Sequence, residues 1–152
     1  MKVEDKLKEL GIELPAVAKP VAAYVPAVQA GKWVYISGQL PLRQGKLEKT
    51  GKAGKEVSLE EAYAEARQCA VNCLAALKSV AGELDNVERI VKVTGFVASA
   101  AGFNAQPKVV NGASELLGQV FGETGKHARA AVGVAELPLD AVVEVELIAL
   151  LK

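Results

Sequence analysis

Residues 58–82 carry the pattern that most limits how this 152-residue chain can fold. Ser58, followed three positions later by Glu61, forms a capping box, which marks the start of a helix. Apolar and small side chains then recur at helical spacing until Gly82, a typical helix stop. They are Leu59, Ala62, Tyr63, Ala66, Cys69, Ala70, Cys73, Leu74, Leu77 and Val80. The pattern predicts a long helix that buries one whole face against another layer of the protein.

The rest of the chain supplies that second layer. A shorter helix is predicted from Pro107 to Phe121, because proline is favoured in a first helical turn and Gly122 follows the last apolar position. Residues rich in β-branched and aromatic side chains predict the strands. We expect strands over 33–37, 87–98, 128–135 and 141–150, with 21–28 pairing onto the first of them.

A third, short helix is predicted at the N-terminus, where Val3, Leu7 and Leu10 recur at helical spacing before Gly11. The predicted order is helix, two strands, long helix, strand, helix and two strands. This order favours an α+β fold in which two amphipathic helices cover one face of a sheet. A chain of this length predicts a single domain over residues 1–152.

Charge and hydropathy argue against two classes of protein. The 18 basic residues are balanced by 18 acidic ones, whereas duplex-binding proteins usually carry a large basic excess. No apolar run reaches the ~18 residues that a membrane-spanning helix needs. Acidic side chains lie within residues 1–6, where a signal peptide has none. We expect a cytoplasmic protein without a membrane or nucleic-acid partner.

The few cysteine and histidine residues limit metal chemistry. Only Cys69, Cys73 and His127 are present, whereas a structural zinc site needs about four such ligands, so no metal site is expected. The two cysteines lie four positions apart on the long helix and share a face. Buried reduced thiols are the simple interpretation, and a redox pair or a metal site is the alternative. His127 is the one candidate for a histidine-based mechanism.

Residues 43–55 form a glycine-rich basic loop. It is not a phosphate-binding P-loop, because Ala53 follows Lys52 where that motif requires serine or threonine. A solvated loop is the simple interpretation, and a surface that faces an anion is the alternative. The basic residues are Arg43, Lys46, Lys49, Lys52 and Lys55.

Arg129 lies in a strand of small apolar residues, 128–134. Because burying an unpaired guanidinium is costly, Arg129 needs either a carboxylate of the protein or an anionic ligand. Glu144 and Glu146 on the last strand are candidates for that partner. A glutamate on a partly buried face can also have a raised pKa and act as a general acid or base.

The last strand is apolar on one parity, whereas its other parity mixes Glu144 and Glu146 with Ile148 and Leu150. This second face is neither clearly core nor clearly solvent, which suggests burial against another subunit. A plain hairpin of the last two strands would leave Arg129 and Glu144 ~14 Å apart. Either the two strands are not neighbours, or a site that uses both residues spans two subunits.

Two further positions carry weak signals. Gly38, after Ser37 at the end of a predicted strand, would allow close approach of a ligand, although a turn glycine is the simpler interpretation. Asn111 lies off the apolar stripe of its helix, and a solvated side chain is the simplest interpretation there.

Taken together, several segments resemble the Rid family, also called the YjgF or reactive intermediate deaminase family. The resemblance runs from about residue 20 to the C-terminus and is strongest to a longer branch of the family, in which residues 1–14 correspond to an added N-terminal helix and linker. The segments are Tyr24-Val25-Pro26, 36–41, 103–112, 128–138 and 143–149.

The resemblance implies a chorismate-mutase-like α+β domain with a mixed β-sheet covered by two helices on one face. It also implies a homotrimer with a central β-barrel and clefts between subunits. The activity it implies is hydrolysis of enamines and imines, such as 2-aminoacrylate and 2-iminopropanoate, to a 2-keto acid and ammonia. No cofactor or metal is implied, and the expected partner is a small imine or keto acid that carries a carboxylate.

The resemblance also implies roles for individual residues. Arg129 matches the arginine that binds the substrate carboxylate, and Glu144 matches the glutamate that positions the hydrolytic water. The remaining matches to the family's cleft are Tyr24, Ser37, Gly38 and Asn111.

One position departs from the family pattern: Ala131 stands where many of the deaminases have cysteine. This departure keeps open a trimeric protein that binds a small carboxylate without catalysis. An endoribonuclease or translation inhibitor is a further alternative, against which the zero net charge and the lack of a histidine pair argue. A purely structural or chaperone-like trimer is the last.

Overall fold

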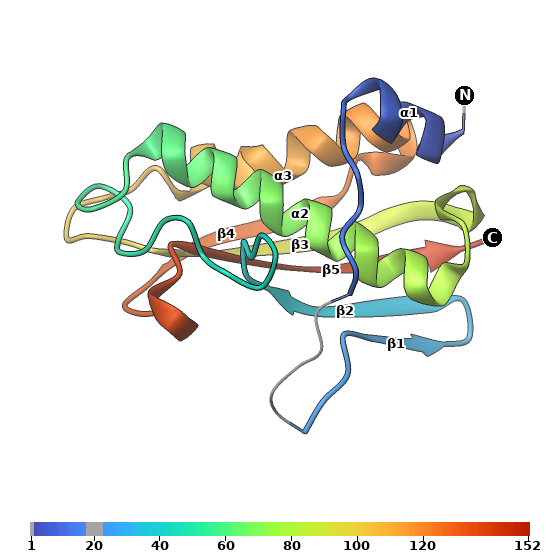
Figure 1. The fold of residues 1–152 in the computed structure, drawn as a ribbon, viewed down its shortest axis with the longest axis horizontal. Helices are drawn as coiled ribbons and strands as arrows, with labels where there is room; N and C mark the ends of the chain where they lie inside the picture. The colour runs from blue at the N-terminus through green and yellow to red at the C-terminus, as the bar shows by residue number, and fades with distance from the viewer. Residues whose placement is uncertain (1, 18–22) are drawn as a thin grey trace.

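The computed structural model describes residues 2–17 and 23–152, which contain one five-stranded sheet (Figure 1). The strands lie in the order β1-β2-β5-β3-β4. Only β3 and β4 run parallel, and the other neighbours are antiparallel, so the expected mixed sheet is confirmed. The strands are β1 (Ala27–Ala30), β2 (Trp33–Gln39), β3 (Val87–Ala98), β4 (Ala128–Val134) and β5 (Val143–Leu151).

Two helices lie side by side on one face of this sheet, α2 (Leu59–Ala81) and α3 (Gln106–Phe121) (Figure 1). A short helix, α1 (Val3–Glu9), packs near the end of α3, and the chain after it runs down across α2. None of the helices within the described residues is long and apolar enough to cross a membrane. The described part of the chain also contains three 3-10 turns: η1 (Leu84–Asn86), η2 (Gly122–Gly125) and η3 (Pro138–Asp140).

Helix α2 begins and ends where its sequence predicts. The Ser58 hydroxyl accepts a hydrogen bond from the Glu61 amide at 3.1 Å, and Glu61 Oε1 accepts one from the Ser58 amide at 3.0 Å. This reciprocal pair satisfies two amides that the first turn would otherwise leave without partners. The helix buries small side chains against the sheet and α3, which lets the layers approach closely.

The close approach of α2 and α3 depends on one glycine. A Cβ at Gly112 would overlap the backbone carbonyl oxygen of Tyr63 on α2. Between the helices and the sheet, the core contains Val34, Val93, Val145, Leu74 and Leu117, all at 0% exposure.

The opposite face of the sheet is not covered within the described residues. Trp33 and Tyr35 of β2 are 43% and 48% exposed, and Val132 of β4 is 44% exposed. Glu144 and Glu146 of β5 are half-buried on this face. The ambiguous parity of the last strand in the sequence therefore corresponds to an open sheet face.

Most of the predicted strand bounds agree with the structure, and β3 has the predicted limits. The strand predicted over 21–28 is shorter: β1 begins at Ala27 and pairs with β2, whereas residues 21 and 22 lie outside the described residues. The last two strands are not neighbours, because β3 lies between β4 and β5. This explains why a plain hairpin does not bring Arg129 and Glu144 together.

Candidate functional site

Arg129 lies on the edge strand β4 and extends its side chain toward α3. Its Nη1 donates to Asn111 Oδ1 at 2.8 Å and to Ser114 Oγ at 3.2 Å, and its Nη2 donates to the Pro107 carbonyl at 3.4 Å. Within residues 2–17 and 23–152, no carboxylate lies within ion-pair distance of Arg129. A structural ion pair to Glu144 or Glu146 is therefore not what holds this guanidinium.

The hydrogen bonds of Arg129 leave one edge of the guanidinium available. A guanidinium has five N–H groups. The three bonds to Asn111, Ser114 and Pro107 occupy three of them. Among the described residues, Nε–H and one Nη2–H have no partner. The Nε/Nη2 edge of a guanidinium is one that can bind a carboxylate through two parallel hydrogen bonds.

Two residues that the sequence analysis did not connect with Arg129 lie behind it. His127 Nε2 is 2.8 Å from Ser114 Oγ, and its Nδ1 is 2.6 Å from the Gly125 carbonyl oxygen. Burial lowers the pKa of His127, and the charge of Arg129 lowers it further, against the opposing bond to Gly125. These residues border a cavity of about 450 Å³.

A sequence signal for both residues exists. Ser114 lies three positions after Asn111 on one helix, so the two share a face. His127 precedes Arg129 by two positions in extended chain, where alternate residues point the same way.

Glu144 forms a second group of residues, on β5 at the open face. Burial raises the pKa of Glu144, and the like charge of Glu146 raises it further. Its carboxylate lies directly against Gly38 of β2, where a Cβ would overlap Oε1. The β2–β5 register shifts here: Ile36 pairs with Leu147 and Gln39 with Val145, so Ser37 and Gly38 both lie opposite Glu146. The bulge brings the Gly38 backbone beside the Glu144 carboxylate.

Ser37 connects this group to the segment before β1. Its hydroxyl donates to the Val25 carbonyl at 2.6 Å, and its amide donates to the Pro26 carbonyl at 2.9 Å. Tyr24, next to Val25, is 55% exposed. Ser37, Gly38 and Glu144 therefore lie together at the strand end where β2 bulges, and Tyr24 directly precedes the residue that the Ser37 hydroxyl contacts.

Within one chain, the residues around Arg129 and the residues around Glu144 do not come together. Arg129 is in register with Val93 of β3, which is buried under the helices, and Glu144 is in register with Phe96. Val93 and Phe96 are three positions apart on a strand, so they point to opposite faces. Arg129 thus lies on the covered face and Glu144 on the open face, ~14 Å apart along and across the strands.

The two cysteines are buried thiols without a disulfide. Cys69 Sγ and Cys73 Sγ donate to the carbonyls of Val143 and Val145, at 3.7 and 3.4 Å. Burial raises the pKa of both thiols, which keeps them protonated. The redox interpretation is therefore not favoured. Groups of three or more metal-ligating side chains are absent from the described part of the chain.

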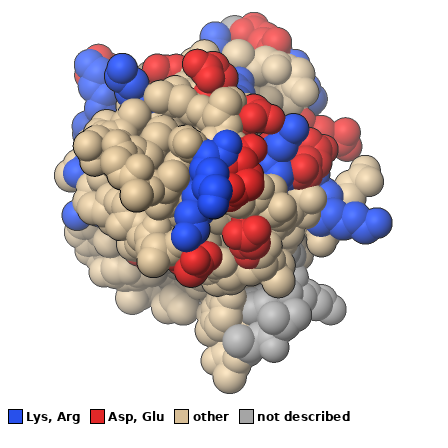
Figure 2. Space-filling model, turned by 90° about the vertical axis from the view of Figure 1, so that its left-hand side faces the viewer, with Lys and Arg blue, Asp and Glu red and all other residues tan. Residues whose placement is uncertain are grey.

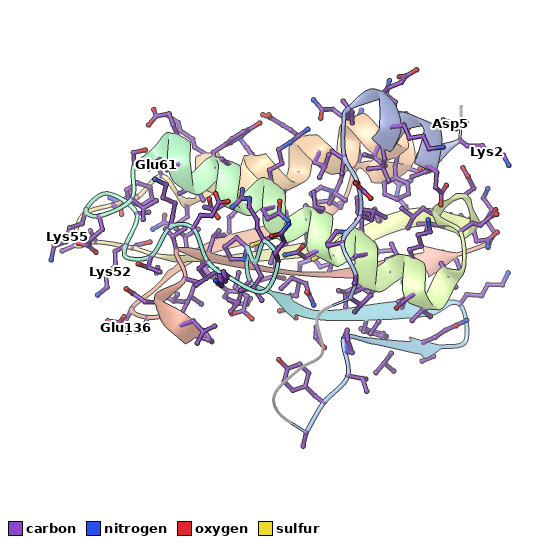
Figure 3. All side chains as sticks on the ribbon, viewed as in Figure 1. Lys2, Asp5, Lys52, Lys55, Glu61 and Glu136 are labelled. Atoms are coloured by element: carbon purple, nitrogen blue, oxygen red, sulfur yellow. The ribbon has the colours of Figure 1, made fainter. Side chains whose placement is uncertain are left out.

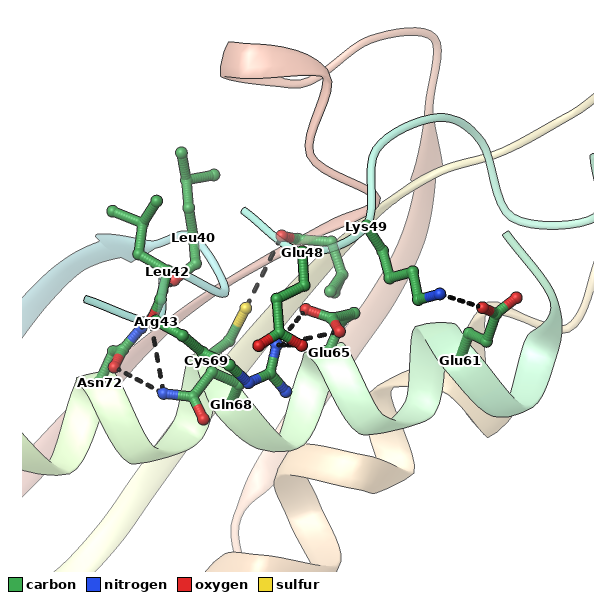
Figure 4. Close-up of polar contacts among 11 residues, drawn as sticks. Leu40, Leu42, Arg43, Glu48, Lys49, Glu61, Glu65, Gln68, Cys69 and Asn72 are labelled. Carbon is green, nitrogen blue, oxygen red and sulfur yellow. Dashed lines mark hydrogen bonds and ion pairs between the residues drawn. The ribbon is translucent and has the colours of Figure 1, made fainter. Parts of the chain in front are cut away.

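Loop 43–55 has most of its positive charge paired with acids of the same chain. Arg43 Nη1 binds both carboxylate oxygens of the buried Glu65, at 3.0 and 2.8 Å, and Lys49 Nζ lies 2.9 Å from Glu61 Oε2 (Figure 4). The bonds to Lys49 and Ser58 lower the pKa of Glu61 to about 2. These pairs fasten the loop to α2.

Farther along the loop, Lys52 Nζ is 3.0 Å from Glu136 Oε1, in the segment after β4 (Figure 3). In the view toward this end of the molecule, basic and acidic side chains alternate, and no broad basic patch forms (Figure 2). The pairing favours the solvated-loop interpretation over a surface that faces an anion.

Comparison with known proteins decides the family. Residues 4–151 match the family model described as "YjgF/chorismate_mutase-like, putative endoribonuclease". The chain belongs to the YjgF, or Rid, family. The expected chorismate-mutase-like fold is thereby confirmed at the level of one chain.

Three relatives show where this YjgF-family chain stands. It is 44% identical to Protein TCP17 of Trypanosoma cruzi over 146 residues, which cover 95% of this chain and 91% of that protein. The crystal structure of Atu1372 from Agrobacterium tumefaciens, a protein described as having unknown function, has a TM-score of 0.92 and 46% identity over 99% of this chain and 92% of that one.

The third relative has a named activity. The 2-iminobutanoate/2-iminopropanoate deaminase of Dermatophagoides farinae is 30% identical over 141 residues, which cover 93% of this chain and 95% of that protein. The YjgF family therefore includes imine deaminases.

Proposed function

We propose that the protein is an enamine/imine deaminase that hydrolyses reactive intermediates such as 2-aminoacrylate and 2-iminopropanoate to a 2-keto acid and ammonia. We place it in the cytoplasm and give it no cofactor. The observation that carries the proposal is the guanidinium of Arg129, which neutral oxygens hold while its carboxylate-binding edge stays available. The named activity of the mite relative supports the reaction type.

The proposal includes a homotrimer whose clefts join the two groups of residues. In such a cleft, Arg129 and Asn111 of one subunit face Glu144, Gly38, Ser37 and Tyr24 of the next. The placement of Arg129 and Glu144 on opposite faces of one sheet supports a site shared between copies. The exposed Trp33 and Tyr35 on the open face support burial of that face against another subunit.

Substrate binding begins with the carboxylate. The Nε–H and Nη2–H groups of Arg129 donate two charge-assisted hydrogen bonds to it. Asn111 and Ser114 hold the other side of the guanidinium, so the fork is oriented before the substrate arrives. The enamine then tautomerises to the imine, which places an electrophilic carbon next to the bound carboxylate.

Hydrolysis follows at that carbon. The ionised Glu144 accepts a proton from a water molecule while the water oxygen attacks the imine carbon and forms a carbinolamine. Glu144 gives this proton to the nitrogen, which completes the neutral carbinolamine. It then accepts the hydroxyl proton of the carbinolamine and passes it to the nitrogen as the C–N bond breaks, so that ammonia and the 2-keto acid leave. The raised pKa of Glu144 suits this role, because it makes the carboxylate a stronger base than an ordinary glutamate.

The test is a semicarbazide-trapping assay. 2-Aminoacrylate is generated from serine by a dehydratase, and the loss of trapped imine is followed with the wild type, Arg129→Ala and Arg67→Ala. Arg67 is a matched control, because its Nη1 donates to Gln119 Oε1 on the outer side of the helices. We expect acceleration by the wild type and Arg67→Ala, and a loss of about 10²- to 10⁴-fold in Arg129→Ala.

A wild type that accelerates no imine across several amino-acid precursors overturns the deaminase and leaves a second candidate, a protein that binds a small carboxylate. The observation that favours this candidate is Ala131, a half-buried methyl group packed against the core where many of the family's deaminases have cysteine. Calorimetric binding of pyruvate, lost in Arg129→Ala, would identify it.

A further inference from the structure

Behind Arg129, a continuous row of hydrogen bonds runs away from the carboxylate-binding edge. It passes from Arg129 Nη1 to Ser114 Oγ at 3.2 Å, on to His127 Nε2 at 2.8 Å, and from His127 Nδ1 to the Gly125 carbonyl at 2.6 Å. Ser114 belongs to α3, whereas His127 and Gly125 belong to the segment that leads into β4. The row therefore joins the two elements that hold Arg129.

The chemistry of its ends sets the direction of every bond in this row. A carbonyl oxygen only accepts, so His127 Nδ1 must carry a proton toward Gly125. In a neutral imidazole, Nε2 then has no proton and accepts one from the Ser114 hydroxyl. The Ser114 oxygen, having donated its hydrogen, accepts from Arg129 Nη1. All three bonds thus point from Arg129 toward Gly125.

We propose that Ser114 and His127 are positioning residues for Arg129: a neutral His127, protonated on Nδ1, orients the Ser114 hydroxyl so that its oxygen fixes Arg129 Nη1 and turns the Nε/Nη2 edge toward the substrate carboxylate. The part of this inference that concerns catalysis rests on the proposed deaminase function. The part that concerns the proton on Nδ1 does not.

At acidic pH, protonation of His127 would give this row of hydrogen bonds a second arrangement. A protonated His127 donates from both nitrogens, so the Ser114 oxygen would receive two donors and its own hydrogen would have to turn away. The imidazolium would also lie beside the guanidinium of Arg129. Burial and that charge lower the pKa of His127, which favours the neutral form at pH 7.

The other charged groups around His127 do not replace Arg129 in this role. Lys126 borders the same cavity, and its Nζ lies 2.8 Å from Glu123 Oε1 on η2. Arg89 of β3 donates to the carbonyls of Glu123 and Lys126 and so faces the same turn. Arg129 is the charged group whose side chain shares a hydrogen-bonding partner, Ser114, with His127.

The same geometry raises a rival interpretation, in which Ser114 is a nucleophile and His127 its base. The two interpretations differ in one measurable respect. A nucleophile forms a covalent adduct with a fluorophosphonate probe, whereas a positioning hydroxyl does not. A Ser114 adduct, found by mass spectrometry of the intact protein, would overturn the positioning role.

The first test measures the protonation of His127 directly and does not require catalytic activity. His127 is the single histidine of the chain, so long-range ¹H–¹⁵N spectra of the wild type contain one imidazole. We expect a protonated Nδ1 and an unprotonated Nε2 at pH 7, with a pKa below the ordinary value, and we expect pyruvate to raise that pKa because its carboxylate offsets the charge of Arg129. A proton on Nε2 would overturn the proposal.

The second test is kinetic and uses graded variants. Ser114→Ala should raise KM for 2-iminopropanoate about tenfold, because a charged donor loses its partner, and Ser114→Thr should restore it. His127→Gln keeps an acceptor for Ser114 but does not titrate. We therefore expect near-normal KM, and we expect the rise in KM on the acid side to occur in the wild type but not in this variant. Ser79→Ala removes a comparable helix hydroxyl, which donates to Ala76 O at 2.6 Å, and is the matched control.

Unchanged KM and unchanged pH dependence in Ser114→Ala would overturn the positioning role even if the deaminase is real. If the wild type is no deaminase, the proposed function fails by itself, and pyruvate affinity replaces KM for the same variants. Circular dichroism and thermal unfolding of each variant separate a local effect from loss of the fold.

Discussion

On the face of the sheet that α2 and α3 cover, the side chains of β2, β3 and β5 are almost completely buried, whereas Trp33 and Tyr35 on the opposite face are 43% and 48% exposed. Arg129, on the covered side, has its neutral partners within its own chain. Glu144, on the open side, has a raised pKa from burial and from a neighbouring like charge. One face is covered by helices of the same chain, whereas the other leaves large aromatic side chains exposed beside a half-buried glutamate.

The largest expected effect comes from the open face. Glu144→Gln should lower kcat for 2-iminopropanoate about 10²- to 10⁴-fold, because it removes the proposed general base. It should also raise stability at pH 7: a carboxyl whose pKa is raised on folding stabilises the fold below its unfolded pKa, and this contribution is lost as pH rises through the folded pKa. Kinetics and thermal unfolding test both. Glu88→Gln, at an exposed position on β3, is the control, and equal kcat in both variants would contradict the assignment.

A smaller effect is expected at the glycine beside Glu144. The Cβ of Gly38→Ala would overlap Glu144 Oε1, the end of a flexible side chain that can swing aside. We therefore expect activity to fall up to ~10²-fold through misplacement of the carboxylate, with little change in the unfolding midpoint. A large loss of stability with normal kcat would mean that the bulge serves the fold and not the site.

On the covered face, replacing a glycine by alanine should instead change the stability of the fold. The Cβ of Gly112→Ala would overlap the carbonyl oxygen of Tyr63, which belongs to rigid helix backbone, so we expect destabilisation by about 1–3 kcal/mol. Gly118→Ala on the same helix has no atom within 4 Å of its Cβ and should stabilise by ~0.5–1 kcal/mol. Urea unfolding measures both. Equal stabilities of the two variants would show that the layers are not closely packed at Gly112.

The smallest effect concerns pH. Glu146 is the second cause of the raised pKa of Glu144, so Glu146→Gln should move the acid limb of the kcat profile to lower pH. The direction follows because the proposed mechanism uses the ionised Glu144, and a lower pKa keeps this carboxylate ionised at more acidic pH. If the acid limb of the kcat profile does not move in Glu146→Gln, a group other than Glu144 determines its position.

The helices were predictable because their signals are local. Ser58, Glu61 and Gly82 lie within the segment they delimit, and their capping contacts need no other part of the chain. The limits of β3 also follow from its own β-branched composition. The edge position of β4 does not follow from its own composition, because it depends on β4 pairing in parallel with β3, a strand far away in the sequence.

The candidate site was predictable only in part. The resemblance to the family suggested six residues, and the structure brings Arg129 to Asn111 and Glu144 to Gly38. The six are Arg129, Glu144, Tyr24, Ser37, Gly38 and Asn111. Neither contact follows from spacing, since each joins elements far apart in the chain. Ser114 was not singled out, and His127 was considered only for a histidine-based mechanism and not connected with Arg129, because a hydroxyl on a helix and a lone histidine have many ordinary uses.

By itself, the sequence determined which segments are helices and strands, which of their faces are apolar, and which side chains can bind a carboxylate or move a proton. The first two properties depend on residues three or four positions apart in a helix and two apart in a strand. The third is the chemistry of the individual side chains. The tertiary structure decided that β3 separates β4 from β5, and that Arg129 and Glu144 point to opposite faces. Strand order and facing depend on long-range packing between layers, which periodicity within one element does not encode.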